Sequence, residues 1–306
     1  MREKTLKIND YTVYTEVYGS MADFLHINRD TRHKVVHCEA DFFGDGVPDP
    51  RFNMFRSREE LWKKIETGNH DPEFAKKIKR VQTTVRTKDV MKLKELKRSV
   101  CGSAVDVGTY LSGVPECMWT LKKKPVKSKI LHVVVDPSVN ANASISDFQR
   151  IAIEVAATIA SLEKSGYRVQ VDLLIDSCYA QDRCVAMTLP LKKSDGALNI
   201  PKLAFMVGDL AFFRGAGFGW LTRNPHAESY DRSLGSELSY FLGEDGFKEL
   251  LHSFYREDVV CFKMCNLVKD IDKIRDEGRR QKLTGTKLEE YIDSEMESRL
   301  TAALVG

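Results

Sequence analysis

The sequence predicts an α/β fold with a doubly wound, mostly parallel sheet, an α+β N-terminal region and a helical C-terminal tail. Three segments lead to this prediction. ILHVVVD at 130–136 is a continuous apolar run, an amphipathic helix pattern follows at 147–165, and YRVQVDLLIDS at 167–177 returns to a strand pattern. Strands that are buried on both faces of a parallel sheet read as such apolar runs. A right-handed crossover through the helix would place the two strands side by side.

The composition is that of a soluble globular protein. The chain has 306 residues, 42% of them hydrophobic and 30% charged, and its net charge of +3 identifies no partner. No apolar run approaches the roughly 18 residues of a membrane span, and the N-terminus lacks the apolar core of a secretory signal. The seven cysteines are scattered, which is typical of reduced thiols in a cytoplasmic protein.

Residues 1–127 are predicted to form the basic α+β region. A helix is expected from 57 to 68, because Ser57 and Glu60 have capping-box spacing and Gly68 stands where a C-terminal cap belongs. From Lys76 to Lys129 there are 15 Lys or Arg against four acids, a local balance of +11.

This basic stretch is a candidate nucleic-acid-binding surface, because clustered cations neutralise phosphates. Aromatic residues for base stacking are sparse there, and charge runs such as KLKELKR at 92–98 are also typical of the solvated face of a helix. The candidate contact residues are Lys76, Lys77, Lys79, Arg80, Lys122, Lys123 and Lys124.

The α/β domain is predicted to span 128–268. Ser146 and Gln149 have capping-box spacing at the start of its long helix. The apolar run at 203–213 fits either a strand or a helix, since periodicity does not separate the two in short runs. DVVCFKMCNLV at 258–268 has the composition of a strand, and the charged tail at 269–306 is expected to be helical with a break at LTGTK.

Each of the two central strands ends in an acid, Asp136 and Asp176. Open α/β sheets bind ligands at the carboxyl ends of their strands, so the two carboxylates are expected to meet at one rim. An Asp followed by Pro, Ser and Asn is also typical of a turn or a helix cap that accepts backbone N–H groups.

The sequence DPSVN after the first strand, with the following helix and LEKSGYRVQVDLLIDS, resembles the von Willebrand factor A-type domain of the integrin and chelatase kind. Asp136, Ser138 and Asn140 match the family's Asp-x-Ser-x-Ser motif, in which the side chains hold Mg²⁺. The resemblance therefore implies a Mg²⁺ site at these three residues, and Asp176 on the neighbouring strand is a further candidate ligand. Asn140 stands where the family has its last serine, and its later threonine and aspartate have no clear match.

A second resemblance concerns three segments in order: SREELWKKIETG at 57–68, VDVGTYLSGVPECM at 105–118 and the unit at 130–175. Together they are similar to uncharacterised proteins of tailed bacteriophages. This resemblance implies a setting, the host cytoplasm or the virion, and no mechanism.

The remaining motifs give weaker evidence of function. GAGFG at 215–219 lacks the Gly-Lys-Ser/Thr ending of a phosphate loop, so a flexible loop is expected there. His132 lies inside an apolar run and is interpreted as a core histidine. No nucleophile elbow of the GxSxG type is present.

These observations predict a non-enzymatic interaction or assembly protein that is associated with a phage or mobile element. It would engage a protein partner at the C-terminal edge of its sheet, through Asp136, Ser138 and Asn140, either with a Mg²⁺ ion or by direct hydrogen bonds. One alternative is a nucleic-acid-binding accessory protein that uses residues 76–129. The other is a metal-dependent hydrolase in which Asp136 and Asp176 hold the ion.

Overall fold

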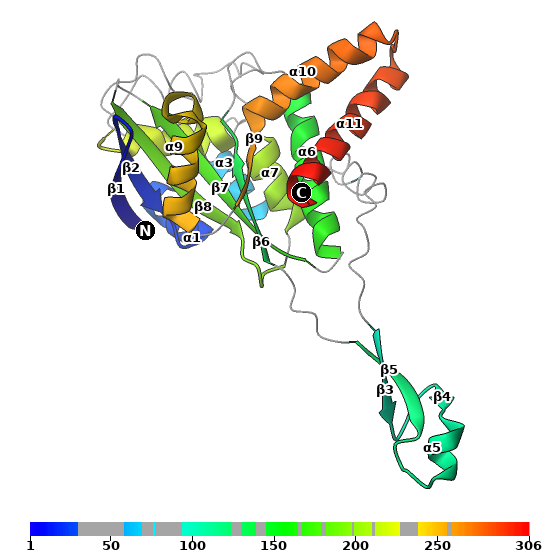
Figure 1. The fold of residues 1–306 in the computed structure, drawn as a ribbon. Helices are drawn as coiled ribbons and strands as arrows, with labels where there is room; N and C mark the ends of the chain where they lie inside the picture. Colours follow the sequence, from blue (N-terminus) through cyan, green and yellow to red (C-terminus); the bar gives the residue numbers. More distant parts are fainter. Residues whose placement is uncertain are drawn as a thin grey trace.

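A six-stranded mixed sheet with helices on both faces forms the centre of the chain (Figure 1). The computed structural model describes residues 1–29, 58–68, 76, 94–123, 130–138, 145–164, 167–178, 182–197, 199–209, 212–226, 238–255 and 259–305. The strands lie in the order β1 (Arg2–Ile8), β2 (Tyr11–Val17), β8 (Arg183–Lys192), β7 (Arg168–Cys178), β6 (Ile130–Asp136) and β9 (Val260–Lys263). The predicted mixture of helices with a mostly parallel sheet is confirmed.

Three of the five strand pairs are parallel, namely β2–β8, β7–β6 and β6–β9. The pairs β1–β2 and β7–β8 are antiparallel. The predicted parallel neighbours are β6 and β7, with Leu131 opposite Val169 and Val135 opposite Leu173. The sheet draws on residues from both the predicted N-terminal region, 1–127, and the predicted α/β domain, 128–268, because β2 pairs with β8.

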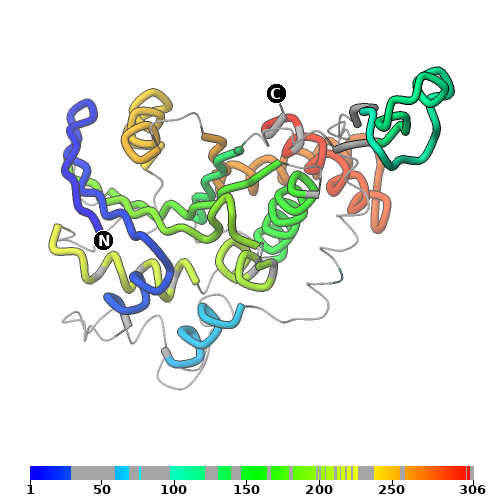
Figure 2. Tube along the Cα trace, turned by 90° about the horizontal axis from the view of Figure 1, so that it is seen from below, coloured from blue at the N-terminus to red at the C-terminus, as the bar shows by residue number. Residues whose placement is uncertain are grey.

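The two faces of the sheet carry different helices (Figure 2). Helix α9 (Leu238–Tyr255) packs on one face, over a cluster that includes Val134 and Leu174. The larger core lies on the other face, beneath α1 (Met21–Arg29), α3 (Arg58–Thr67), α6 (Ile145–Lys164), α7 (Ile200–Gly208), η1 (Phe212–Gly217) and α8 (Phe218–Arg223). The C-terminal helices α10 (Met264–Arg280) and α11 (Thr286–Val305) pack against α6.

Several local predictions need correction. The run at 203–213 is helical, in α7 and η1, and GAGFG lies in η1 and α8, so the expected loop is wrong. A Cβ on Gly215 would lie 2.6 Å from Leu61 Cδ2, so this glycine lets η1 approach α3 closely. The strand expected at 258–268 stops at Lys263, where α10 begins.

A separate three-stranded sheet is formed by β3 (Lys94–Ser99), β4 (Ala104–Val105) and β5 (Met118–Lys123), with the short helix α5 (Val107–Leu111). Residues 94–98 of the run KLKELKR, expected on a helix, lie in β3 instead, because Lys94–Ser99 pairs along its length with β5. Figure 1 draws this sheet apart from the layered body. Residues Lys94–Lys123 are called the 94–123 unit below.

A buried carboxylate joins the N-terminal strands to α8. Glu16 Oε2 accepts hydrogen bonds from Tyr18 Oη at 2.7 Å, Trp220 Nε1 at 2.8 Å and a terminal guanidinium nitrogen of Arg223 at 2.9 Å. Glu16 Oε1 accepts a further bond from Asn224 Nδ2 at 3.1 Å. A buried charge requires such partners, because leaving it unpaired costs several kcal/mol.

Within the described part of the chain, no helix combines the length and the apolar character needed to cross a bilayer.

The interface of α6 with α11 should make stability depend on pH. Glu154 on α6 is buried, and its pKa is raised from 4.5 to about 8. Burial is the largest cause, followed by the negative charges of Asp293 and Glu297, while the positive charge of Arg150 lowers the pKa. Between these two pKa values the folded chain binds more protons than the unfolded chain, so the free energy of unfolding should fall as pH rises from about 5 to 8.

Glu154→Gln removes this ionisation and keeps the shape of the side chain. At about pH 8.5 we expect the variant to be more stable than wild type by on the order of 3 kcal/mol, with little advantage near pH 5. Urea unfolding at both pH values measures the difference, and Glu290→Gln, an exposed change on α11, is the control. A Glu154→Gln advantage that does not change with pH would contradict this account.

Candidate functional site

The predicted C-terminal rim carries Asp136 at the end of β6 and Asp176 near the end of β7. Side chains alternate along a strand, and Val134 and Leu174, two residues earlier, belong to the cluster under α9. Both carboxylates therefore lie on the α9 face. Burial raises the pKa of the Cys261 thiol, and the charges of Asp136 and Asp176 add to this rise, so both acids lie near one thiol of β9.

The rim acids act as acceptors for backbone groups. Asp136 Oδ1 accepts a hydrogen bond from the backbone N–H of Ser138 at 2.9 Å. Asp176 Oδ1 accepts one from the N–H of Leu238, the first residue of α9, at 3.1 Å. Asp136, Ser138 and Asp176 are all fully buried. The Asp136 bond is the local geometry that the turn interpretation of this residue describes, whereas Asp176 accepts from a helix distant in the sequence.

The rim meets the requirements of Mg²⁺ only in part. Carboxylate and hydroxyl oxygens suit a hard cation, and the buried Ser138 hydroxyl has no hydrogen-bond partner among the described residues. Yet the described residues bring no three His, Cys, Asp or Glu side chains into an arrangement that could hold a metal ion. Asn140 lies outside the described residues, so the Mg²⁺ site stays a prediction.

A buried lysine supplies positive charge at the same rim. Lys263 lies opposite Asp136 in the β6–β9 register. Its ammonium group is 3.2 Å from Glu244 Oε1 and 4.2 Å from the centre of the Phe247 ring. The Lys263 side chain is 9% exposed, so its charge is little screened and its ion pair with Glu244 adds a positive group near the rim.

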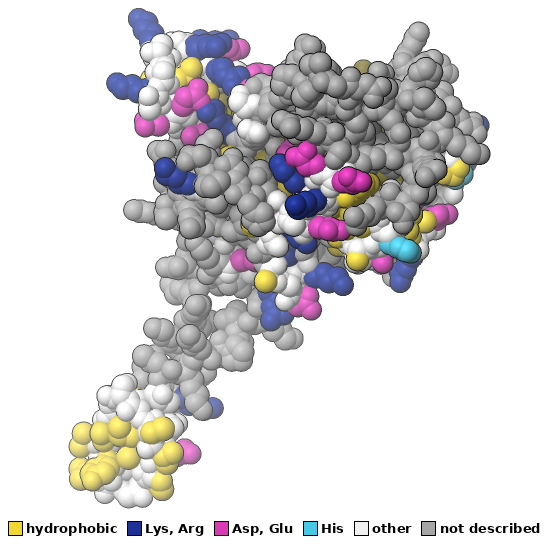
Figure 3. All heavy atoms as spheres, turned by 180° about the vertical axis from the view of Figure 1, so that it is seen from behind, with side chains coloured by type: hydrophobic (Ala, Val, Ile, Leu, Met, Phe, Trp, Pro, Cys, Tyr) yellow, Lys and Arg dark blue, Asp and Glu magenta, His cyan; other side chains and the backbone are white. Residues whose placement is uncertain are grey.

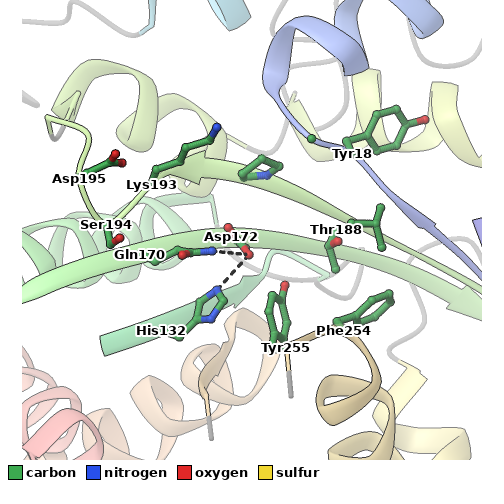
Figure 4. A pocket seen from close by; sticks show the side chains of 13 residues that line it. Tyr18, His132, Gln170, Asp172, Thr188, Lys193, Ser194, Asp195, Phe254 and Tyr255 are labelled. Carbon is green, nitrogen blue, oxygen red and sulfur yellow. Dashed lines mark hydrogen bonds and ion pairs between the residues drawn. The ribbon is translucent and has the colours of Figure 1, made fainter. Parts of the chain in front are cut away.

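A second group of polar residues lines a cavity of about 610 Å³ at the other end of the same sheet face. His132 Nε2 lies 3.0 Å from Asp172 Oδ2, and Gln170 Nε2 donates to the same oxygen at 3.5 Å (Figure 4). Tyr255 packs edge-on against the His132 ring, with 4.4 Å between the ring centres.

The interpretation of His132 as a core histidine missed this cavity. The signal that could have found it is the alternation in the two apolar strands. His132 on β6, and Gln170 and Asp172 on β7, are polar residues at positions that face the α9 side. Parallel pairing then brings them together, since His132 lies opposite Gln170.

The predicted nucleic-acid contacts fall partly outside the described residues, which omit Lys77, Lys79, Arg80 and Lys124. Lys76 is exposed. Lys122 and Lys123 lie on β5, where Lys123 is opposite Lys94 and Lys122 is opposite Glu95. The pairing thus brings Lys94 and Lys123, at the two ends of the 94–123 unit, opposite one another.

The 94–123 unit also exposes large apolar side chains, which gather on its surface in Figure 3. Leu111 is 78% exposed and Tyr110 is 63% exposed. Four valines are exposed beside them in the sequence: Val100, Val105, Val107 and Val114. Of the side chains described between Lys97 and Thr120, only Thr109 is buried.

A family model described as "Domain of unknown function (DUF7192)" matches residues 2–263. No curated protein and no solved structure matches the chain.

If the rim binds Mg²⁺, millimolar MgCl₂ should raise the melting temperature of the wild type, because a ligand that binds only the folded state stabilises it. Asp136→Asn should abolish this rise, since the amide oxygen can still accept from Ser138 but carries no charge. Differential scanning fluorimetry measures the shift, and Asp245→Asn, on an exposed carboxylate of α9, is the control. An unchanged wild-type melting temperature would count against the metal.

Proposed function

The chain belongs to the DUF7192 family, and we propose that it is a non-enzymatic interaction or assembly protein that binds a protein partner through the 94–123 unit. The observation that carries the proposal is the exposure of apolar side chains on this unit, led by Leu111 and Tyr110. Large exposed apolar patches mark interaction sites.

The described side chains of the unit, from Lys97 to Thr120, form too little core to account for its stability. A small sheet needs a hydrophobic face packed on something else to be stable in water. Here the described side chains of the unit bury only Thr109, and α5 has five residues. A partner surface that covers Leu111, Tyr110 and their neighbours would supply the missing burial, at about 25 cal/mol per Å² of apolar area.

The partner should be a protein whose apolar surface is bordered by acidic groups. The 94–123 unit contains five Lys or Arg and three Asp or Glu, a balance of +2, and its flanks in the sequence are more basic still. Lys97 and Arg98 are exposed on β3, which is an edge strand. Cations at the rim of an interface speed association and exclude partners of the same charge.

Three finer parts of the sequence-based hypothesis belong to this proposal. The von Willebrand A-like arrangement is supported by the parallel β6–β7 pair and by helices on both faces of the sheet. A partner contact at the C-terminal rim, with or without Mg²⁺, and the setting in a phage or mobile element stay predictions. The hydrolase alternative finds less support, because Asp136 and Asp176 are buried and bonded to backbone groups.

Nucleic-acid binding is the second candidate, and the register of β3 with β5 favours it. Lys94 lies opposite Lys123, and Arg98 lies opposite Trp119, with its guanidinium 5.3 Å from the centre of the Trp119 ring. Basic residues beside an aromatic ring are typical of single-strand binders.

Leu111→Lys should weaken partner binding at least tenfold, which corresponds to about 1.4 kcal/mol. To find the partner, a photo-crosslinking amino acid is placed at position 111, and in a second chain at position 240, in cells that express the protein. The protein crosslinked only from position 111 is then purified, and its affinity is measured by calorimetry. Tyr240→Lys is the matched control, because Tyr240 is 86% exposed on α9, outside the unit.

Crosslinking that is equal at the two positions, or an affinity that Leu111→Lys leaves unchanged, would refute the proposed surface. A crosslink from position 111 to a second copy of the chain would replace the acidic partner with self-association.

For the nucleic-acid alternative, fluorescence anisotropy with a labelled single-stranded DNA gives a clear expectation. With four phosphate contacts, affinity should fall about 50-fold between 50 and 200 mM salt, from a slope of about −0.7 per phosphate. The double variant Lys122→Glu/Lys123→Glu should abolish binding, whereas Lys248→Glu on α9 should not. Absence of binding at 50 mM salt eliminates this alternative.

A further inference from the structure

The cavity on the α9 face lies away from the 94–123 unit and from the C-terminal rim, and the proposed function does not use it. It is built near the N-terminal ends of the parallel strands, where His132 is the third residue of β6 and Gln170 the third of β7. The end of β2, the distal part of β8 and the last turn of α9 complete it. Its volume of about 610 Å³ falls in the range of small-molecule sites.

Two polar atoms that border the cavity are buried and unsatisfied. Asp172 Oδ2 accepts from His132 and Gln170, but Asp172 Oδ1 has no hydrogen-bond partner among the described residues. The Tyr255 hydroxyl also has no partner at ordinary hydrogen-bond distance, but it lies close enough to Asp172 and Thr188 for both side chains to affect its pKa. The Asp172 side chain is only 8% exposed, so water gives it little compensation. An unmade hydrogen bond at a buried group costs about 1–3 kcal/mol.

The charge and hydrogen-bonding groups of Asp172 and Tyr255 indicate which class of ligand the cavity would bind. The Asp172 carboxylate, which accepts hydrogen bonds from His132 and Gln170, gives the cavity a negative charge. Burial raises the pKa of Tyr255 well above 10, and the charge of Asp172 adds to the rise, so the phenol stays neutral. The rings of Tyr255 and Phe254 line the same cavity, and aromatic faces attract cations.

We propose that this cavity binds a small organic cation, an amine or guanidinium compound, whose charged nitrogen is held by the negative charge of the Asp172 carboxylate beside Tyr255. His132 is a positioning residue here: its Nε2 lies 3.0 Å from Asp172 Oδ2 and holds the carboxylate in place. Figure 4 shows the Tyr255 hydroxyl directed toward Asp172 and Thr188, and Lys193 and Asp195 also line the cavity.

The test uses the full chain with 1,4-diaminobutane and with agmatine, which carries a guanidinium group. Succinate, a four-carbon dianion, is the control ligand at equal ionic strength. We expect each cation to raise the melting temperature in a saturable manner, to shift the NMR signals of the His132 ring, and to give a binding isotherm by calorimetry. Succinate should do none of these.

Asp172→Asn should weaken cation binding at least tenfold, because it removes the charge and keeps the shape. Tyr255→Phe, which keeps the ring and removes only the hydroxyl, should weaken it by a smaller factor and provides a second test if Asp172→Asn fails to fold. Glu249→Gln, an exposed acid-to-amide change on α9, should bind like the wild type.

The inference is overturned if neither cation binds the wild type, if succinate binds equally well, or if the Asp172 and Tyr255 variants bind as tightly as Glu249→Gln. These outcomes are independent of the partner surface, since no variant in this test lies in the 94–123 unit.

Discussion

The parallel pairing of β6 with β7 across α6 is the constraint on which the rest of the structure depends. Nearly every side chain of α6 from Asp147 to Glu163 is buried or half-buried, because the sheet covers one side and α7, α10 and α11 cover others. With this helix on one face, the even-numbered positions of both strands must point to the α9 face. The cavity and the rim are therefore both consequences of a single crossover.

Much of this centre could be predicted from sequence, because long apolar runs and a strongly periodic helix leave few alternatives. The parallel neighbours, the helix between them and the α3 helix near Leu61 all follow from local patterns. The addition of β1 and β2 to the same sheet could not be predicted, because pairing Thr12 with Arg183 joins residues more than 170 positions apart. Local patterns also failed at Lys94–Ser99, where pairing with β5 overrides the appearance of a charged helix face.

The candidate sites also divide into residues that sequence could predict and residues that it could not. Asp136 and Asp176 could be predicted because each ends an apolar run, and the geometry at Asp136 fits the turn interpretation. Asp172 and His132 lie within strands rather than at their ends. The role of a polar residue at such a position can be inferred only when the neighbouring strand is known. Sequence alone could not distinguish a buried, paired histidine from one that lines a cavity.

The hydrogen bonds of Glu16 set the order in which the chain can mature on the ribosome. Their partners Trp220, Arg223 and Asn224 lie 204, 207 and 208 residues further along, and the parallel neighbour of β2 begins at Arg183. A lone two-stranded hairpin is marginal in water. At translation rates of about 5–20 residues per second, the first strands wait roughly 10–40 s with an open edge before their neighbours emerge. A nascent chain of this protein is therefore most exposed to aggregation, and to capture by chaperones, at its N-terminal end.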